Sequence, residues 1–188
     1  EGNTIWISQF PPKLIFQILR DDTSAPIYYL FVHFWCAIFG YSEFALRALS
    51  VLFATISVPL FFLVARKILT NTFASILCLA FYGFCYFQIW YAQEVRCYSL
   101  LTLLSLASVY LLLRCLERPT HACLVLSGVA IAGTLYTHNT ALFYLPGLAL
   151  LWLIYPADLT ISTRVKSGAV IVAVVFVLYA AWIPTLLS

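Results

Sequence analysis

Long apolar runs separated by short polar gaps make up most of this chain. The runs at 73–113 and 122–155 would form helices of about 60 and 50 Å, much longer than the ~30 Å hydrocarbon core of a bilayer, so each must turn. The polar groups at 93–96 and 137–140 are the places where those turns fit. The pattern predicts an all-α bundle of about six transmembrane helices, at 44–65, 73–91, 98–113, two within 122–155, and 168–187.

The first 42 residues are more polar and predict two short helices outside the hydrocarbon. In 11–20, Lys13, Gln17 and Arg20 share one helical face and apolar residues share the other, which is typical of a helix lying along the membrane interface. The apolar segment 26–39 is about 21 Å long as a helix, too short to cross a bilayer. We therefore expect one membrane domain, 1–188, with an extracytoplasmic loop at 1–42 and transmembrane helices at 43–188.

Composition places the chain in a membrane. Hydrophobic residues make up 64% of it, charged residues 9%, and the mean hydropathy is +1.00. The chain starts with Glu1 and contains no Met, so we expect it to be a fragment of a longer protein. None of the six cysteines forms a CxxC pair, and we interpret them as small packing residues rather than as a disulfide or metal framework.

The few charges sort by sign between the two sides of this zigzag path. Basic residues fall in the gaps of one side, namely Arg66, Lys67, Arg114, Arg118, Arg164 and Lys166. Most acids, together with His138, fall in the gaps of the other side, namely Glu1, Asp21, Asp22, Glu43 and Glu94. The positive-inside rule makes the acidic side extracytoplasmic, in what we expect to be a bacterial plasma membrane. Topology accounts for the net charge of +3, so no nucleic-acid partner is expected.

The strongest candidate for chemistry is the predicted turn at 93–96. Ionisable residues at a membrane are costly and are functional candidates by default. Glu94 and Arg96 either form an ion pair that caps the hairpin, or Arg96 holds a phosphate while Glu94 orients a donor, a metal or a hydroxyl. Gln93 and Tyr98 flank them as candidate donor-binding residues.

Three further positions have both a structural and a functional interpretation. Asp22 is either part of an N-cap cluster before Pro26 or a general base or metal ligand, and Glu1 is a further catalytic candidate. His138 is either a hydrogen-bonding turn residue or a member of the same site as Glu94, and Lys13 is a weaker phosphate partner. A divalent cation is the one cofactor considered, with Glu94, His138 and Asp22 as candidate ligands.

Four segments together resemble a known family. Residues 22–35, DTSAPIYYLFVHFW, are similar to a D-x-H-P-P-L-Y-Y-x-x-x-H-x-W pattern, with Ser24 in place of the His, and 40–47, GYSEFALR, are similar to G-x-S-E-F-A-L-R. Residues 91–98, YAQEVRCY, resemble Y-S-Q-E-A-R-x-Y, and 136–139, YTHN, resemble Y-T-H-Y with Asn139 in place of the aromatic residue. The chain thus resembles the GT-C membrane glycosyltransferases, in the branch of the dolichyl-phosphate-mannose–protein mannosyltransferases.

The resemblance implies transfer of a hexosyl or pentosyl group from a polyprenyl-phosphate donor to a glycan, lipid or protein acceptor on the extracytoplasmic face. It also implies two juxtamembrane helices in the first outer loop, and an Asp-Glu pair at its start, of which Glu1 looks like the Glu. The Asp and the first span would then lie upstream, and this fragment would be inactive by itself. The alternatives are a transporter or lipid flippase with a polar site at the outer face, and a non-catalytic scaffold. Transporters usually place polar sites near the midplane, which favours the enzyme.

Overall fold

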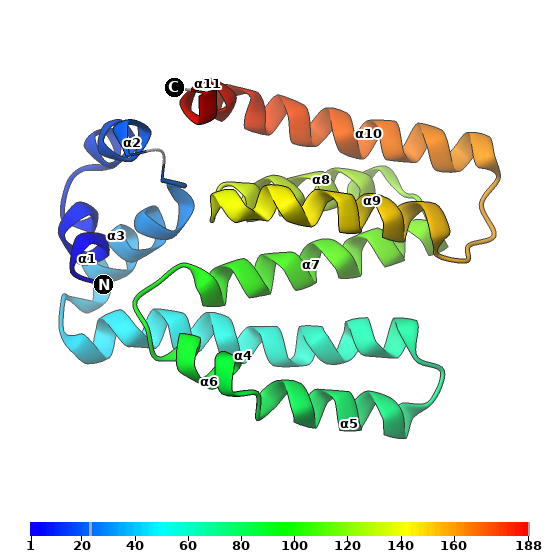
Figure 1. Cartoon of the computed structure of the whole chain (residues 1–188), viewed down its shortest axis with the longest axis horizontal. Coiled ribbons are helices and arrows are strands. Elements are labelled where there is room, and N and C mark those ends of the chain that lie inside the picture. The colour runs from blue at the N-terminus through cyan, green and yellow to red at the C-terminus, as the bar shows by residue number, and fades with distance from the viewer. Residues whose placement is uncertain (23, 188) are drawn as a thin grey trace. The chain divides into compact units, whose positions relative to one another are not determined.

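The computed structural model describes residues 1–22 and 24–187, whose regular structure is helical throughout (Figure 1). Thr23, which belongs to the first motif, and Ser188 lie outside the described residues. The prediction of an all-α membrane protein is confirmed. The chain divides into two compact units, Glu1–Leu103 and Leu104–Ser188, with the boundary inside one long helix.

Three short helices open the first unit. They are α1 (Gly2–Ser8), α2 (Pro12–Asp21) and α3 (Ile27–Phe39). Helices α2 and α3 lie where the two juxtamembrane helices were predicted, whereas α1 was not expected to be helical. The amphipathic pattern of α2 is also confirmed, because Ile15 and Leu19 are fully buried and the polar face is exposed. Helix α3 ends at Gly40, whose φ of 78° is a backbone conformation that favours glycine.

The first unit continues with the long helix α4 (Glu43–Ile68), which packs against α5 (Thr72–Gly83) and α6 (Tyr86–Ala92). Ser42 caps α4 by accepting a hydrogen bond from the Ala45 amide at 3.2 Å. The far end of α4 carries Arg66 and Lys67, where cations interact favourably with the helix dipole.

The single span predicted at 73–91 is wrong in one respect, because the structure breaks it into α5 and α6, bent by 51°. The break faces a buried polar group, Ser57 of α4. Its Oγ accepts a hydrogen bond from Gln88 Nε2 at 2.9 Å and lies 2.6 Å from the Tyr82 hydroxyl. Polar groups in an apolar setting must satisfy one another, and the bend brings residues from both halves of the run to Ser57.

The second unit contains the rest of α7 (Tyr98–Glu117), followed by further helices. The later elements are α8 (His121–Leu135), the 3₁₀ helix η1 (Asn139–Tyr144), α9 (Leu145–Ile154), α10 (Ile161–Tyr179), η2 (Ala180–Trp182) and α11 (Ile183–Leu187). Its core includes Leu112, Leu124, Ile131, Leu148 and Ile171. The turn expected at 137–140 is confirmed by the break between α8 and η1.

Helix α10 begins at Ile161 rather than at residue 168, so the predicted cytoplasmic loop at 156–167 is shorter than expected. Thr160 provides the cap by accepting a hydrogen bond from the Thr163 amide at 3.2 Å. Arg164, in the first turns of α10, donates to the Leu153 and Tyr155 carbonyls at 3.0 and 2.6 Å and so satisfies the end of α9.

The predicted number of six spans is not confirmed. Within the described residues, three helices are long and apolar enough to cross a membrane, namely Glu43–Ile68, Tyr98–Glu117 and Ile161–Thr185. The bent α5–α6 pair gives a fourth when it is counted as one broken span. The apolar helices at His121–Leu135 and Asn139–Ile154 are shorter than that length. The turn in the run 122–155 was therefore predicted correctly, but it leaves two helices of less than bilayer length.

The interpretation of all six cysteines as packing residues is wrong for one pair. Cys115 and Cys123 form a disulfide, with their Cα atoms 5.9 Å apart. The pair joins the end of α7 to the start of α8, which a three-residue link brings together. The other four cysteines, Cys36, Cys78, Cys85 and Cys97, are free thiols.

Candidate active site

The turn at 93–97 connects α6 to α7 and lies at the end of the first unit that also carries α1–α3 and the start of α4 (Figure 1). Val95 at its centre is 3% exposed and anchors the turn in the protein. The side chains on either side are more accessible, with 26% of Glu94 and 51% of Arg96 exposed. The buried Val95 thus anchors a turn whose carboxylate and guanidinium remain accessible.

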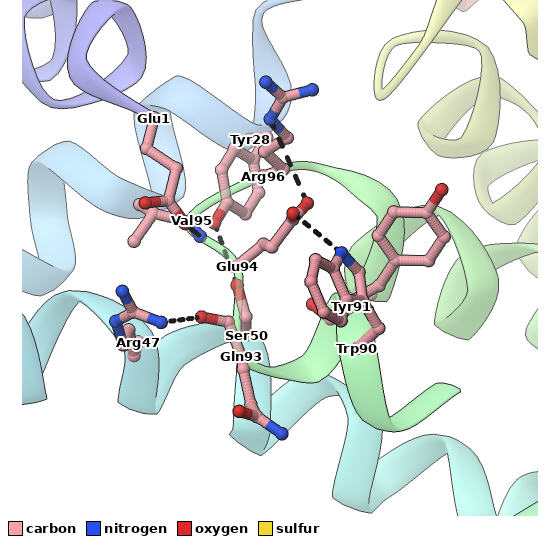
Figure 2. A network of polar contacts seen from close by, with 11 residues as sticks. Glu1, Tyr28, Arg47, Ser50, Trp90, Tyr91, Gln93, Glu94, Val95 and Arg96 are labelled. Atoms are coloured by element: carbon pink, nitrogen blue, oxygen red, sulfur yellow. Dashed lines mark hydrogen bonds and ion pairs between the residues drawn. The ribbon is translucent and has the colours of Figure 1, made fainter. Parts of the chain in front are cut away.

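Hydrogen bonds from distant parts of the sequence hold this turn (Figure 2). The Glu1 carboxylate accepts from the Val95 amide at 2.9 Å, and Arg47 of α4 donates to the Gln93 carbonyl at 2.7 Å. From α7, the Ser99 hydroxyl donates to the Tyr91 carbonyl at 2.9 Å. Two of these bonds involve a charged group, which makes them stronger than neutral hydrogen bonds.

Glu94 and Arg96 are themselves positioned by aromatic neighbours. Trp90 Nε1 donates to Glu94 Oε1 at 2.9 Å, and Arg96 Nε lies 4.0 Å from Glu94 Oε2. A side-chain hydrogen bond with Tyr98 raises the pKa of Arg96, with a smaller contribution from Glu94, so the guanidinium stays fully cationic. Figure 2 shows its terminal nitrogens pointing away from the Glu94 carboxylate. The arrangement suits a site that receives an anion beside a fixed carboxylate.

Two adjacent tyrosines of α3 line the same region of the first unit. The Tyr28 hydroxyl is 3.0 Å from Ser50 Oγ, and burial raises its pKa well above the usual range. The pKa of Tyr29 is also raised, chiefly by burial, with smaller electrostatic contributions from Cys97 and Asp22. Burial raises the pKa of the Cys97 thiol to about 11. These groups are neutral at neutral pH, so the carboxylates remain the candidates for proton transfer.

Asp22 ends α2, exposed to solvent, and its Oδ2 accepts a hydrogen bond from Ser24 Oγ at 2.8 Å. The interpretation of this segment as an N-cap cluster is not borne out among the described residues, because Pro26 occupies the cap position of α3 and makes no side-chain cap hydrogen bond. The electrostatic effects of Asp22 and Cys97 on Tyr29 place both near that phenol. The first unit therefore carries Asp22 in addition to Glu1, Gln93, Glu94, Arg96 and Tyr98, which meet at the turn.

Two further predicted site residues belong to other elements. Lys13 is exposed near the start of α2. His138 belongs to the second unit, where its side chain caps η1. Its Nδ1 accepts a hydrogen bond from the Thr140 amide at 3.2 Å and lies 2.8 Å from the Thr140 hydroxyl. The amide donor requires an unprotonated Nδ1, so a neutral His138 ring carries its proton on Nε2. That His138 shares a site with Glu94 stays a prediction.

The side chains that could ligate a metal are dispersed in the part of the chain that the structure describes. No three His, Cys, Asp or Glu side chains come together there as a metal-binding group. The proposed ligands Glu94 and Asp22 lie in the first unit and His138 in the second.

Sequence reasoning missed the residues that hold the turn. Arg47 pairs with Glu43, one helical turn earlier, at 2.9 Å, but nothing in the sequence indicated that Arg47 also bonds to a carbonyl 46 residues away. Trp90 and Ser99 were also missed. Trp90 lies four residues before Glu94, a helical spacing that was an available signal for that contact.

The chain matches a protein-family model. The model described as dolichyl-phosphate-mannose-protein mannosyltransferase matches residues 23–182, which is most of the chain. Comparisons with curated proteins and with solved structures found no match.

Proposed function

The chain belongs to the dolichyl-phosphate-mannose–protein mannosyltransferase family, and from that premise we propose that it transfers a sugar from a polyprenyl-phosphate donor to a hydroxyl of a glycan, lipid or protein at the extracytoplasmic face. The family consists of membrane glycosyltransferases of the GT-C type, which favours this function over the transporter alternative. The observation that carries the proposal for the site is the turn at 93–97, where a fixed cation and a fixed carboxylate stand side by side.

In the proposed reaction, the bond between the sugar C1 and the phosphate oxygen breaks and a bond from C1 to the acceptor oxygen forms. The leaving group is a lipid phosphate whose negative charge grows in the transition state, so a cation aimed at it accelerates the reaction. Arg96 takes this role because its guanidinium is accessible and can bind phosphate oxygens in a bidentate manner.

The acceptor hydroxyl must lose a proton, which a carboxylate can accept. We assign this role to Asp22, which is exposed near the same group of side chains. Glu94, fixed by Trp90, is assigned to the sugar hydroxyls or the acceptor. Glu1 acts as a positioning residue, because its carboxylate is engaged with the Val95 amide.

The test is sugar transfer by the full gene product in proteoliposomes supplied with radiolabelled polyprenyl-phosphate hexoses and pentoses. We expect turnover of one donor by the wild type. Arg96→Gln should raise the donor KM by roughly ten- to hundredfold, the effect of one charge-assisted hydrogen bond, and Arg96→Lys should recover part of it. Glu94→Gln retains an acceptor for Trp90 but removes the charge, and it should lower kcat.

Matched controls lie on α4 and α7, at the ends of these helices that are far from the turn. Arg66→Gln changes a cation at the far end of α4, and Glu117→Gln changes an acid at the far end of α7. Both controls should transfer sugar at the wild-type rate. A folded wild type that consumes none of these donors contradicts the proposed function, and normal kinetics in Arg96→Gln contradict the assignment of the phosphate site.

A further inference from the structure

Helix α6 carries Trp90, the donor that fixes Glu94, yet apolar packing does not set the position of α6 itself. None of its seven residues is buried, and its ring side chains include Tyr86, Phe87 and Trp90, each more than half exposed. A helix without a buried face gains little from apolar burial. Hydrogen bonds must therefore decide how α6 lies against α4, which runs beside it in Figure 1.

Ser57 of α4 makes these bonds with a single hydroxyl group. The side chain is fully buried, and its Oγ donates to the Ala54 carbonyl at 2.6 Å. A serine hydroxyl has one proton and two lone pairs, so Ser57 Oγ accepts from both other neighbours, Tyr82 Oη at 2.6 Å and Gln88 Nε2 at 2.9 Å. The hydrogen-bonding capacity of Ser57 is thus used completely, with one donor coming from α5 and one from α6.

The same face of α4 also holds Tyr82 by its ring. Phe61, one helical turn after Ser57, stacks on Tyr82 with ring centroids 4.2 Å apart and an interplanar angle of 5°. Gln88 Nε2 has a second, longer contact of 3.5 Å with the Ala54 carbonyl. Ser57, Tyr82 and Gln88, the Ser57 cluster, therefore attach both sides of the α5–α6 break to one stretch of α4.

The attachment of Gln88 sets the direction of Trp90. Residues two positions apart on a helix point about 200° apart, so a Gln88 held against α4 leaves Trp90 on the opposite face of α6. From there its Nε1 donates to Glu94 Oε1 at 2.9 Å (Figure 2). Any rotation of α6 about its axis would carry the indole away from the carboxylate.

The bend between α5 and α6 matters for the same reason. The seven residues of α6 make a helix about 10 Å long, so a change of about 10° in the bend would move its far end by about 2 Å. A misplacement of about 1 Å can cost on the order of a hundredfold in rate. The 51° bend must therefore be held closely for Glu94 to stay in place.

We propose that the Ser57 cluster is a positioning element of the transfer site, which fixes the bend and rotation of α6 and, through Trp90, places Glu94. Its three residues act at a distance from the substrate. Its role in catalysis rests on the proposed function of the turn at 93–97, whereas its role in holding α6 does not.

The first test measures amide hydrogen exchange in the full gene product without substrate. We expect Ser57→Ala to speed exchange at Ile89, within α6, and at Val95, in the turn, while Leu46 near the start of α4 stays unchanged. The matched control is Ser75→Ala, which removes another fully buried hydroxyl, one that donates to the Asn71 carbonyl at 3.2 Å. Exchange at all three amides should be unchanged in this control.

The second test measures sugar transfer in proteoliposomes. Ser57→Ala should lower kcat by roughly ten- to hundredfold and change the donor KM by less than about threefold. The two constants separate because Glu94 is held from α6, whereas Arg96 is hydrogen-bonded to Tyr98 of α7. Ser75→Ala should transfer sugar at the wild-type rate.

Trp90→Phe provides a readout that a purely structural role would not give. It removes the Nε1 donor and keeps an aromatic ring. Because the cluster acts through Trp90, adding Ser57→Ala to Trp90→Phe should lower kcat by only about threefold or less. Tyr82→Phe and Gln88→Met each remove one donor to Ser57, and each should reproduce part of the effect, so the test does not depend on the folding of Ser57→Ala alone.

Unchanged exchange at Ile89 and Val95 in the folded variants of the Ser57 cluster overturns the proposal, whether or not the wild type transfers sugar. So do additive losses of kcat from Ser57→Ala and Trp90→Phe, or an equal loss in Ser75→Ala. A wild type that consumes no donor while these variants exchange faster contradicts the proposed function and supports the attachment of α6 by the cluster.

Discussion

At the scale of single residues, the candidate site depends on side chains that do not touch the expected substrate. Arg47 pairs with Glu43 at 2.9 Å on its own helix and donates to the Gln93 carbonyl at 2.7 Å. A planar guanidinium can satisfy both partners at once, which a lysine does less well. The position of Glu94 and Arg96 therefore depends on a residue of α4.

We expect Arg47→Gln to loosen the turn at 93–97 and lower kcat for sugar transfer, with Arg47→Lys intermediate. Faster amide hydrogen exchange at Val95 is the readout that separates loss of positioning from a general loss of stability. Arg66→Gln, which loses a hydrogen bond to Thr72 at the other end of α4, is the control and should leave exchange in the turn unchanged. Unchanged exchange in Arg47→Gln contradicts the positioning role.

Cys97 gives a pH-dependent prediction at the same site. Its pKa is raised from 9.0 to about 11 by burial, so below pH 9 the thiolate fraction is roughly 100-fold smaller than for an unperturbed thiol. We expect its alkylation by iodoacetamide at pH 8 to be slower by about that factor than that of a cysteine introduced at the exposed Asn3, and to rise tenfold per pH unit up to about pH 11. Peptide mass spectrometry measures both rates. Equal rates at pH 8 contradict the burial of this thiol.

The raised pKa of Cys97 also makes the folding stability depend on pH. Because the folded state holds the Cys97 proton more tightly than the unfolded state, its contribution to stability is complete below the unfolded pKa and is lost as the pH rises toward 11. Removing this group by Cys97→Ser should therefore reduce the loss of stability between pH 9 and 11.

At the scale of helices, close packing of α8 against α10 depends on a small residue. A Cβ added at Gly128 would lie 2.6 Å from Val174 Cβ, and 3.2 Å from the Ile171 carbonyl oxygen. We expect Gly128→Ala to cost about 1–3 kcal/mol of unfolding free energy. Val174→Gly in the same chain removes both the Cβ and the Cγ1 that the added methyl would meet, and it should recover part of that cost. Unfolding in denaturing detergent measures both. Additive effects of the two substitutions contradict a direct clash.

The helices themselves were largely predictable, because apolar runs and the polar gaps between them are local signals. The amphipathic α2 and the turn at 93–97 were found in this way. The break between α5 and α6 was missed because its cause, the hydrogen bonding of Gln88 and Tyr82 to Ser57, joins residues more than 20 positions apart. The start of α10 was missed because Arg164 was interpreted as a loop charge, whereas it binds the end of α9.

At the scale of the whole molecule, the charge pattern predicts the side of the membrane on which each turn lies. We expect a cysteine introduced at Thr140 to react with a membrane-impermeant maleimide from outside intact cells, and one at Asp158 to react after permeabilisation. Both positions are exposed. Labelling of Thr140→Cys from inside instead would mean that the short helices α8 and α9 form a re-entrant hairpin rather than two crossings.

The candidate site was less predictable than the topology. Its charged members, Glu94 and Arg96, stood out because charges are rare in this chain. The residues that hold them, such as Arg47 and Ser99, carry no local signal because each acts on a backbone carbonyl elsewhere. Whether His138 joins them depends on the placement of one unit against the other, which no short motif encodes.

The bond between Glu1 and the Val95 amide spans 94 positions of sequence, and this has a consequence for biosynthesis. At a ribosomal rate of about 5–20 residues per second, Val95 emerges roughly 5–20 s after Glu1. During that interval the carboxylate lacks this partner, and α4, α5 and α6 must be inserted before the contact can close. Such a large sequence separation makes this end of the first unit a late product of assembly, so a nascent chain acquires its membrane anchorage before the turn at 93–97 is ordered.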